Sequence, residues 1–180
     1  MDLFEYIAKL IEEKGNVVIA IDGMAGAGKS TFAKKLSAIA DSRIISTDDF
    51  HLPQNMRTEK RYRIPGGNID HERMKIEVID HVREIITYGV YDCGSDVIND
   101  TRELPAKPLT IIEGTYSMHP DFGQYYDLSF FLECDPKYQI KRLAKRDLSK
   151  LNDFKTKWIP METLYFTKTK VRDKADCIIG

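Results

Sequence analysis

Short apolar runs alternate with amphipathic stretches along the 180 residues of this chain. The runs are rich in β-branched residues and are bounded by turn-forming or charged residues, as in the segment VVIAI between Asn16 and Asp22. Runs of this length and composition predict strands buried on both faces. The predicted strands are residues 16–22, 43–47, 108–113, 127–133 and 175–180.

Apolar residues at helical spacing predict helices between these strands. The first helix is expected to end at Gly15. Residues 69–88 are predicted to form one long helix, because they carry an apolar stripe made of Met74, Val78, Val82, Ile85 and Ile86. Residues 52–68 have the composition of a loop, and residues 89–107 that of a hairpin excursion. The other predicted helices are residues 30–40, 136–146 and 154–170.

Strands that alternate with helices predict an α/β fold, with a mostly parallel five-stranded sheet flanked by helices. A chain of 180 residues is expected to form a single domain over residues 1–180. Right-handed crossovers place the carboxyl ends of parallel strands at one edge of the sheet, where ligands bind. The polar residues of interest follow strand ends, so we expect them to meet at this edge.

The strongest chemical signal is the segment GMAGAGKS at residues 23–30, which fits the pattern G-x-x-x-x-G-K-[ST] at every fixed position. Its glycines let backbone amides turn inward around a phosphate, and the helix that follows adds its partial positive charge. Lys29 is expected to reach the β- and γ-phosphates, and the Ser30 hydroxyl to bind Mg²⁺. The motif predicts a P-loop NTPase fold with ATP and Mg²⁺ as cofactors. The predicted nucleotide-binding residues are Gly23, Met24, Ala25, Gly26, Ala27, Gly28, Lys29, Ser30 and Thr31.

Two other classes of P-loop protein fit the sequence less well than a kinase. A GTPase should carry an Asn-Lys-x-Asp motif that reads the base, and the chain contains none. A motor ATPase is usually longer and has an aspartate in its second motif. The sequence therefore favours phosphoryl transfer to an acceptor.

Carboxylates follow two of the predicted strands. Asp48 and Asp49 come directly after the second strand, and Glu113 ends the strand at residues 108–113. A hydroxyl that attacks a γ-phosphate needs a carboxylate to orient it and accept its proton, and Mg²⁺ needs oxygen ligands. We assign the catalytic role to Asp48 before Asp49, because only one of two adjacent side chains can point into the site. Asp49 is kept as a candidate for substrate binding.

The charge balance excludes some partners. Basic and acidic residues number 27 and 28, a net charge of −1, so neither a nucleic-acid nor a membrane partner is expected. The apolar runs are too short to span a bilayer, and the acidic, amphipathic N-terminal segment does not resemble a signal peptide. A cytoplasmic protein is expected. Its cysteines, Cys93, Cys134 and Cys177, lack the spacing of a disulfide framework or a zinc site.

The order of the motifs resembles the uridine kinase and phosphoribulokinase group of P-loop kinases, which includes nicotinamide riboside kinases. The resemblance runs through nearly the whole chain and rests on GMAGAGKS, STDDFHLP, NIDHERM, VYDCGS, IIEGTYS, KRLAKRD and ADCII. It implies that Asp48 is the general base and a neighbour of the metal, and that Glu113 is the second acidic residue of the metal site. It also implies that Arg142 and Arg146 neutralise charge on the transferred phosphoryl group.

The resemblance is weaker on the acceptor side. Asp70 matches an aspartate that holds ribose hydroxyls in these kinases, although it is also placed to cap a helix. In uridine kinases a Tyr-Asp-Phe motif continues to a histidine, whereas here Tyr91 is followed by Cys93 and by Asp96 at the place of the histidine. Tyr91 and Asp96 are the substrate-binding candidates of this segment. The lid, at about residues 147–155, lacks the usual Arg-Gly-Arg.

These observations predict transfer of the γ-phosphoryl group of ATP to a hydroxyl of a small metabolite, in first place a nucleoside such as uridine or cytidine. Kinases of another riboside, a sugar or a hydroxy acid remain alternatives. A P-loop ATPase or switch without an acceptor, and a nucleotide-binding module with a structural role, are the other hypotheses. The last is disfavoured because Lys29, Ser30, Asp48 and Glu113 are all intact. The oligomeric state is left open.

Overall fold

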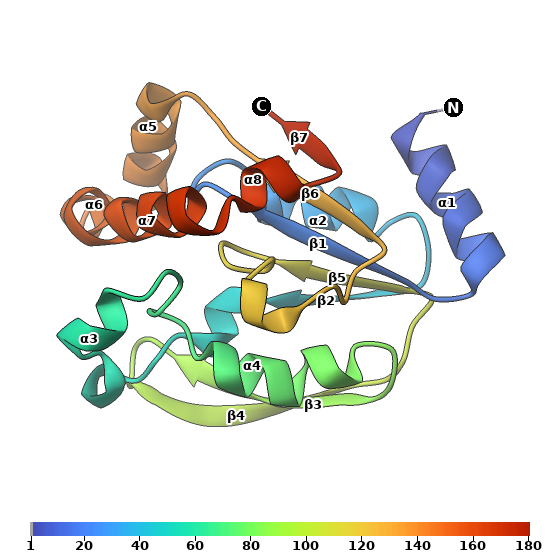
Figure 1. The fold of residues 1–180 in the computed structure, drawn as a ribbon, viewed down its shortest axis with the longest axis horizontal. Helices are drawn as coiled ribbons and strands as arrows, with labels where there is room; N and C mark the ends of the chain where they lie inside the picture. Colours follow the sequence, from blue (N-terminus) through green and yellow to red (C-terminus); the bar gives the residue numbers. More distant parts are fainter. Residues whose placement is uncertain (1) are drawn as a thin grey trace.

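The centre of the molecule is a sheet of five parallel strands in the order β2-β5-β1-β6-β7 (Figure 1). The computed structural model describes residues 2–180. All residues of the three inner strands are buried, as expected for strands that are covered on both faces. The strands are β1 (Val17–Gly23), β2 (Ser42–Ser46), β5 (Leu109–Glu113), β6 (Leu128–Leu132) and β7 (Cys177–Ile179). The predicted five-stranded parallel sheet is confirmed.

Strand β1 divides its side chains between two apolar layers, because successive side chains point to opposite faces. Val17, Ile19 and Ile21 pack in the layer covered by α1 (Leu3–Lys14) and α2 (Lys29–Leu36). Val18 and Ala20 pack in the opposite layer. That layer is covered by α4 (His71–Glu77), α7 (Ile159–Thr169) and α8 (Val171–Lys174).

Helix α1 shows how local sequence sets an element's ends. The Asp2 carboxylate accepts the Glu5 amide at 2.9 Å, and the Glu5 carboxylate accepts the Asp2 amide at 3.1 Å, which is a capping box. At the other end Gly15 adopts a left-handed conformation with φ of 74° and closes the last turn. The predicted end at Gly15 is confirmed.

The carboxyl ends of the strands face the left side of Figure 1, where several short elements gather. Among them are α3 (Glu59–Tyr62), α5 (Pro136–Arg146), α6 (Leu151–Asp153) and the π-helical turn η5 (Phe154–Trp158). The 3₁₀ turns are η1 (Thr47–Phe50), η2 (Gln54–Met56), η3 (Ile79–His81) and η4 (Pro120–Phe122). No helix within residues 2–180 is both long and apolar enough to cross a membrane.

The prediction of one long helix over residues 69–88 is wrong. Helix α4 ends at Glu77, and Ile86 already begins an antiparallel hairpin of β3 (Ile86–Asp92) and β4 (Val97–Leu104), drawn at the bottom of Figure 1. The apolar stripe of this segment is buried at Met74, Val78, Val82 and Ile86, but Ile85 is exposed. The apolar stripe therefore predicts most of the buried side chains correctly, but it predicts the wrong backbone conformation.

Arg43 supplies a physical reason why no helix runs through residues 82–88. Its guanidinium is buried and donates to the carbonyls of Val82 and Glu84, both at 2.7 Å. A continued helix would bond these carbonyls to its own amides. The same guanidinium donates to the carbonyls of Leu104 and Pro105 and to the Thr110 hydroxyl, so it joins the hairpin to the sheet.

We expect the substitution Arg43→Met to lower the free energy of unfolding by about 3 kcal/mol or more, because each buried carbonyl left without a donor costs about 1–3 kcal/mol. Urea unfolding followed by circular dichroism measures the change. Arg63→Met is the matched control: the Arg63 side chain is exposed and pairs with the exposed Glu59, and such a pair contributes about 1 kcal/mol or less. Equal losses in the two variants would contradict this role of Arg43.

Candidate active site

The phosphate-binding turn follows β1 and leads into α2, as the motif requires. Gly23, Gly26 and Gly28 all have positive φ values, of 131°, 74° and 103°. Residues with side chains rarely adopt these conformations. At Gly23 a Cβ atom would also lie 2.0 Å from the carbonyl oxygen of Leu132 on the neighbouring strand β6. The glycine at this position is therefore required twice, by conformation and by space.

Lys29 lies under this turn with its side chain largely buried. Its ammonium group donates to the carbonyls of Gly23 and Met24, at 2.8 and 2.9 Å, and to the hydroxyl of Thr115 at 3.1 Å. Thr115 lies in the loop that follows β5 and donates to the Gly23 carbonyl at 2.9 Å. Thr115 thus joins the phosphate-binding turn to the neighbouring strand end.

The two predicted acidic positions meet beside Ser30. The Ser30 hydroxyl donates to Glu113 Oε1 at 3.2 Å, and Ser46 ends the adjacent strand β2 in register with Glu113. Burial raises the pKa of Glu113, and the negative charge of Asp48 raises it further. Two carboxylates that repel each other next to a hydroxyl form a set of oxygen ligands suited to Mg²⁺.

Asp48 has an ionised carboxylate at the edge of this group. Its Oδ1 lies 3.6 Å from His51 Nε2. The contact with His51 is the main cause that lowers the pKa of Asp48, whose side chain is 68% exposed, and the positive charges of Lys29 and Arg146 add to the lowering. A carboxylate held in its ionised form can accept a proton from an approaching hydroxyl.

The neighbouring Asp49 is directed elsewhere. Its Oδ2 accepts from the Tyr88 hydroxyl at 3.0 Å and pairs with Arg102 at 2.8 Å, both on the β3–β4 hairpin. Burial raises the pKa of Asp49. Asp49 does not line the cavity described below. The structure therefore separates the two adjacent aspartates: Asp49 contacts the hairpin, and its contact with substrate stays a prediction.

A cavity of about 470 Å³ lies over the phosphate-binding turn, within the usual range for small-molecule sites. Arg142 and Arg146 of α5 both line it, and Arg142 also donates to the Gly26 carbonyl at 3.1 Å. The region predicted as a lid contributes Asp147, Lys150 and Phe154 to the wall. Further lining residues are Asp48, His51, Asn68, Ile69, Cys93, Glu113, Thr115, Tyr116, Trp158 and Glu162.

Asp70 caps α4 in this structure. Its Oδ1 accepts the Arg73 amide at 3.0 Å, and its Oδ2 lies 3.6 Å from Arg73 Nε. The cavity is lined by Asn68 and Ile69, which precede Asp70, but not by Asp70 itself. The alternative role as a helix cap is the one observed, and the contact with ribose hydroxyls stays a prediction.

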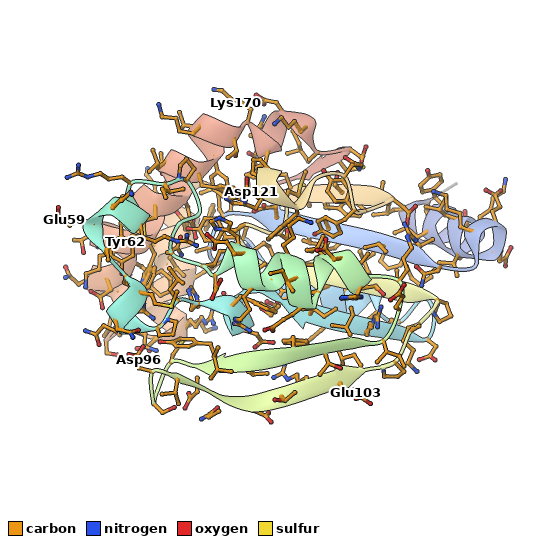
Figure 2. The ribbon with its side chains drawn as sticks, turned by 60° about the horizontal axis from the view of Figure 1, so that its bottom comes forward. Glu59, Tyr62, Asp96, Glu103, Asp121 and Lys170 are labelled. Carbon is orange, nitrogen blue, oxygen red and sulfur yellow. The ribbon has the colours of Figure 1, made fainter. Side chains whose placement is uncertain are left out.

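Tyr91 and Asp96 interact with each other and lie outside the cavity lining. The Tyr91 hydroxyl donates to Asp96 Oδ1 at 2.7 Å, and Asp96 also accepts the Gln54 amide at 2.9 Å. Figure 2 shows Asp96 at the turn between β3 and β4. The pair fixes this turn against the segment after Leu52, so a direct contact between either residue and substrate has no support in this arrangement. Cys93, from the same motif, does line the cavity.

The sequence reasoning missed two buried carboxylates at this site. Asp22, at the end of β1, is fully buried and accepts from the amides of Gly23, Tyr116 and Met118 and from the Tyr165 hydroxyl. Burial raises the pKa of Asp22. A carboxylate directly before the glycine turn, in an otherwise apolar strand, was an available signal for Asp22. Glu162 had no such local signal, because it reaches the site from α7.

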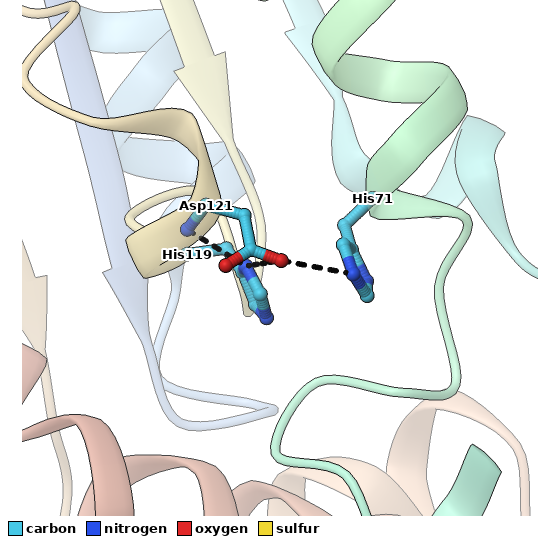
Figure 3. A group of neighbouring side chains, drawn as sticks. All are labelled: His71, His119 and Asp121. Atoms are coloured by element: carbon cyan, nitrogen blue, oxygen red, sulfur yellow. Dashed lines mark hydrogen bonds and ion pairs between the residues drawn. The ribbon is translucent and has the colours of Figure 1, made fainter.

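A second group of polar side chains lies away from the phosphate-binding turn. His71 of α4 faces Asp121 of η4 with His71 Nε2 3.1 Å from Asp121 Oδ2, and His119 lies beside them (Figure 3). The two imidazole rings stack with centroids 4.4 Å apart and planes 19° from parallel. Nitrogen lone pairs lie in the ring planes, so stacked rings do not direct them at one ion. Arg61 also lies 3.2 Å from His71 Nδ1. This geometry favours a hydrogen-bonded stack over a metal site.

The chain matches a family model and is similar in sequence to proteins named uridine kinase. A family model described as an AAA domain matches residues 19–155, a range that includes the phosphate-binding turn, Asp48, Glu113 and both arginines of α5. A uridine kinase of Ureaplasma parvum serovar 3 is 26% identical over 152 residues, covering 77% of this chain and 72% of the relative. A uridine kinase of Clostridium botulinum (strain Kyoto / Type A2) is 25% identical over 180 residues, covering 87% and 85%.

The fold is also similar to a solved structure described as a possible uridine kinase from Bacillus stearothermophilus. The TM-score is 0.74 at 19% identity, and the alignment covers 98% of this chain and 97% of the other. The resemblance to uridine kinases that the order of motifs indicated is confirmed by the named relatives. The structural likeness supports the fold alone.

Proposed function

We propose that this chain, which belongs to the AAA domain family, is an ATP-dependent kinase that transfers the γ-phosphoryl group to a hydroxyl of a small metabolite. One observation carries the proposal: Lys29, Ser30, Asp48 and Glu113 line a single cavity together with Arg142 and Arg146. A site that only binds nucleotide has no chemical need for this whole set. The relatives named uridine kinase support transfer over simple hydrolysis.

In this proposal the phosphates of ATP lie on the turn at residues 23–30, and Lys29 contacts the β- and γ-phosphates. Asp48 orients the acceptor hydroxyl and receives its proton as the oxygen attacks the γ-phosphorus. Arg142 and Arg146 balance the negative charge that spreads over the transferred group. Both arginines lie on the last turns of α5, next to the predicted lid, and line the cavity over the phosphate-binding turn.

The residues present fit a magnesium ion. The Ser30 hydroxyl and the carboxylates of Glu113 and Asp48 are hard oxygen donors, and the repulsion between the two acids would be relieved by a divalent cation. When bound, Mg²⁺ would neutralise phosphate charge and favour departure of ADP. Ser30, Asp48 and Glu113 are therefore the proposed metal-site residues.

The acceptor proposed first is a nucleoside such as uridine or cytidine. Uridine kinases are named among the relatives, and aromatic side chains that can pack against a base line the cavity, namely His51, Tyr116, Phe154 and Trp158. His51 and Trp158 contact each other there, with ring centroids 5.8 Å apart, although Cys93 replaces the ring that uridine kinases have at its position. Another riboside, a sugar or a hydroxy acid is the alternative acceptor.

The proposal is tested by mixing the purified protein and Mg·ATP with single candidate acceptors, starting with ribosides, and measuring ADP formation. We expect at least one hydroxyl metabolite to accelerate ADP formation and to be consumed in equal amount. Steady phosphate release that no metabolite accelerates would instead support the rival hypothesis of a P-loop ATPase or switch.

A further inference from the structure

Glu162 is a buried carboxylate in direct contact with the phosphate-binding turn. It lies on α7, the helix that follows the predicted lid, and only 6% of the residue is exposed. Its Oε2 accepts the Ala25 amide at 3.1 Å. Its Oε1 lies 3.4 Å from the Thr115 hydroxyl oxygen. An acid is thus held against a turn whose amides and lysine are built to bind phosphate.

Thr115 connects Glu162 to the catalytic lysine. The Thr115 oxygen lies 3.1 Å from Lys29 Nζ, and the same hydroxyl bonds the Gly23 carbonyl. The positive charge of Lys29 stabilises the Glu162 carboxylate and lowers its pKa. A γ-phosphate that binds Lys29 would therefore share this counter-charge with Glu162.

We propose that Glu162 is a positioning residue for the phosphate-binding turn, and that its carboxyl takes up a proton from water when a nucleoside triphosphate binds. The physical reason is the repulsion between the arriving phosphate charge and a buried carboxylate. Proton uptake converts the carboxylate to a neutral acid that can still accept the Ala25 amide through its carbonyl oxygen. The inference rests on nucleotide binding within the proposed function and is independent of the acceptor.

The burial of Glu162 and the nearby charge of Asp22 both favour its protonated form. Burial raises its pKa to about 7, while Lys29 and the bonds from Ala25 and Thr115 oppose the rise. The other titratable groups that face it are Asp22 on β1, Tyr116 after β5, and Cys134 before α5. Of these, the negative charge of Asp22 raises the pKa of Glu162. Bound phosphate adds negative charge and raises this pKa further.

The test measures protons directly. Titration calorimetry with Mg²⁺ and a non-hydrolysable β,γ-imido analogue of ATP, repeated in buffers of different ionisation enthalpy, gives the number of protons bound. With a starting pKa of about 7, wild-type protein should take up about half a proton more than Glu162→Gln at pH 7, and up to about one more at pH 8. The affinity of wild-type protein should fall with rising pH by up to about tenfold per pH unit relative to the variant.

Subtracting the proton count of Glu162→Gln from that of the wild type corrects for protons released or bound by the nucleotide itself. Glu12→Gln, on the exposed side of α1, is the matched control and should behave as wild type. ADP should cause a smaller uptake than the triphosphate analogue. Equal proton uptake by wild type and Glu162→Gln would overturn the inference.

A second measurement covers the case in which Glu162→Gln does not fold. Infrared difference spectra of the wild-type protein, recorded with and without the analogue, should gain a band of a protonated carboxyl. A spectrum without this band, from protein that binds the analogue, would overturn the inference and leave the proposed function intact. Failure of wild-type protein to bind the analogue at all would contradict the proposed function itself.

Discussion

Replacing Asp48 by Asn should lower the rate of phosphoryl transfer by about 10²–10⁴-fold, the usual contribution of a positioned general base. The amide keeps the shape of the side chain but cannot accept the hydroxyl proton. Asp48 lines the cavity, and the contact with His51 lowers the pKa of its carboxylate. Single-turnover transfer to the best acceptor measures the rate, and binding of a fluorescent ATP analogue should persist in the variant.

Asp49→Asn is the matched control for this experiment, because it changes the adjacent residue in the same chemical way. The Asp49 carboxylate is 14% exposed, pairs with Arg102 and accepts from the Tyr88 hydroxyl, so the variant should lose about 1–3 kcal/mol of stability. The transfer rate should stay close to that of the wild type. A large loss of transfer in Asp49→Asn together with normal turnover in Asp48→Asn would reverse the assignment of the two aspartates.

Replacing Gly23 by Ala should destabilise the fold by at least about 4 kcal/mol, the size expected where strain and a backbone clash coincide. The added Cβ would lie 2.0 Å from the Leu132 carbonyl oxygen and 2.6 Å from the Leu132 nitrogen. These atoms belong to strand β6, which is paired with β1 and cannot move aside alone. Chemical denaturation measures the loss, and a chain that fails to fold is the same outcome in a stronger form.

Gly15→Ala measures the cost of the backbone conformation without a steric clash. Gly15 also has a positive φ, of 74°, but nothing lies within 4 Å of the Cβ position. This variant should therefore cost only about 1–2 kcal/mol, the penalty of a left-handed residue. Equal losses in the two variants would mean that the close approach of β6 contributes nothing.

Much of the fold could be predicted because its signals are local. The buried strands are short runs of apolar, β-branched residues, and the glycine turn has a fixed spacing that leads directly from a strand into a helix. Parallel strands bring their carboxyl ends together, so the sequence alone predicts that Asp48 and Glu113 lie near Ser30. The 3.2 Å contact between Ser30 and Glu113 agrees with that reasoning.

The remaining features of the fold and of the site depend on contacts between distant parts of the chain, which the sequence pattern does not predict. The periodicity of residues 69–88 gave no indication that Arg43 would take the carbonyls of Val82 and Glu84 and that a hairpin would begin at Ile86. Asp96 occupies a motif position of the family, yet its carboxylate bonds Tyr91 and the Gln54 amide. Glu162 reaches Ala25 across most of the sequence. Such pairings have no signature in either segment alone.

The proposed activity is transfer of a phosphoryl group from ATP to a metabolite hydroxyl at the cavity over the phosphate-binding turn. The most direct test is mass spectrometry of the products formed from Mg·ATP and each candidate acceptor, with uridine and cytidine first, comparing wild type with Asp48→Asn. We expect one acceptor to gain one phosphoryl group for each ADP formed, with little product in Asp48→Asn. Release of free phosphate at the same rate with and without every acceptor would contradict the proposed activity.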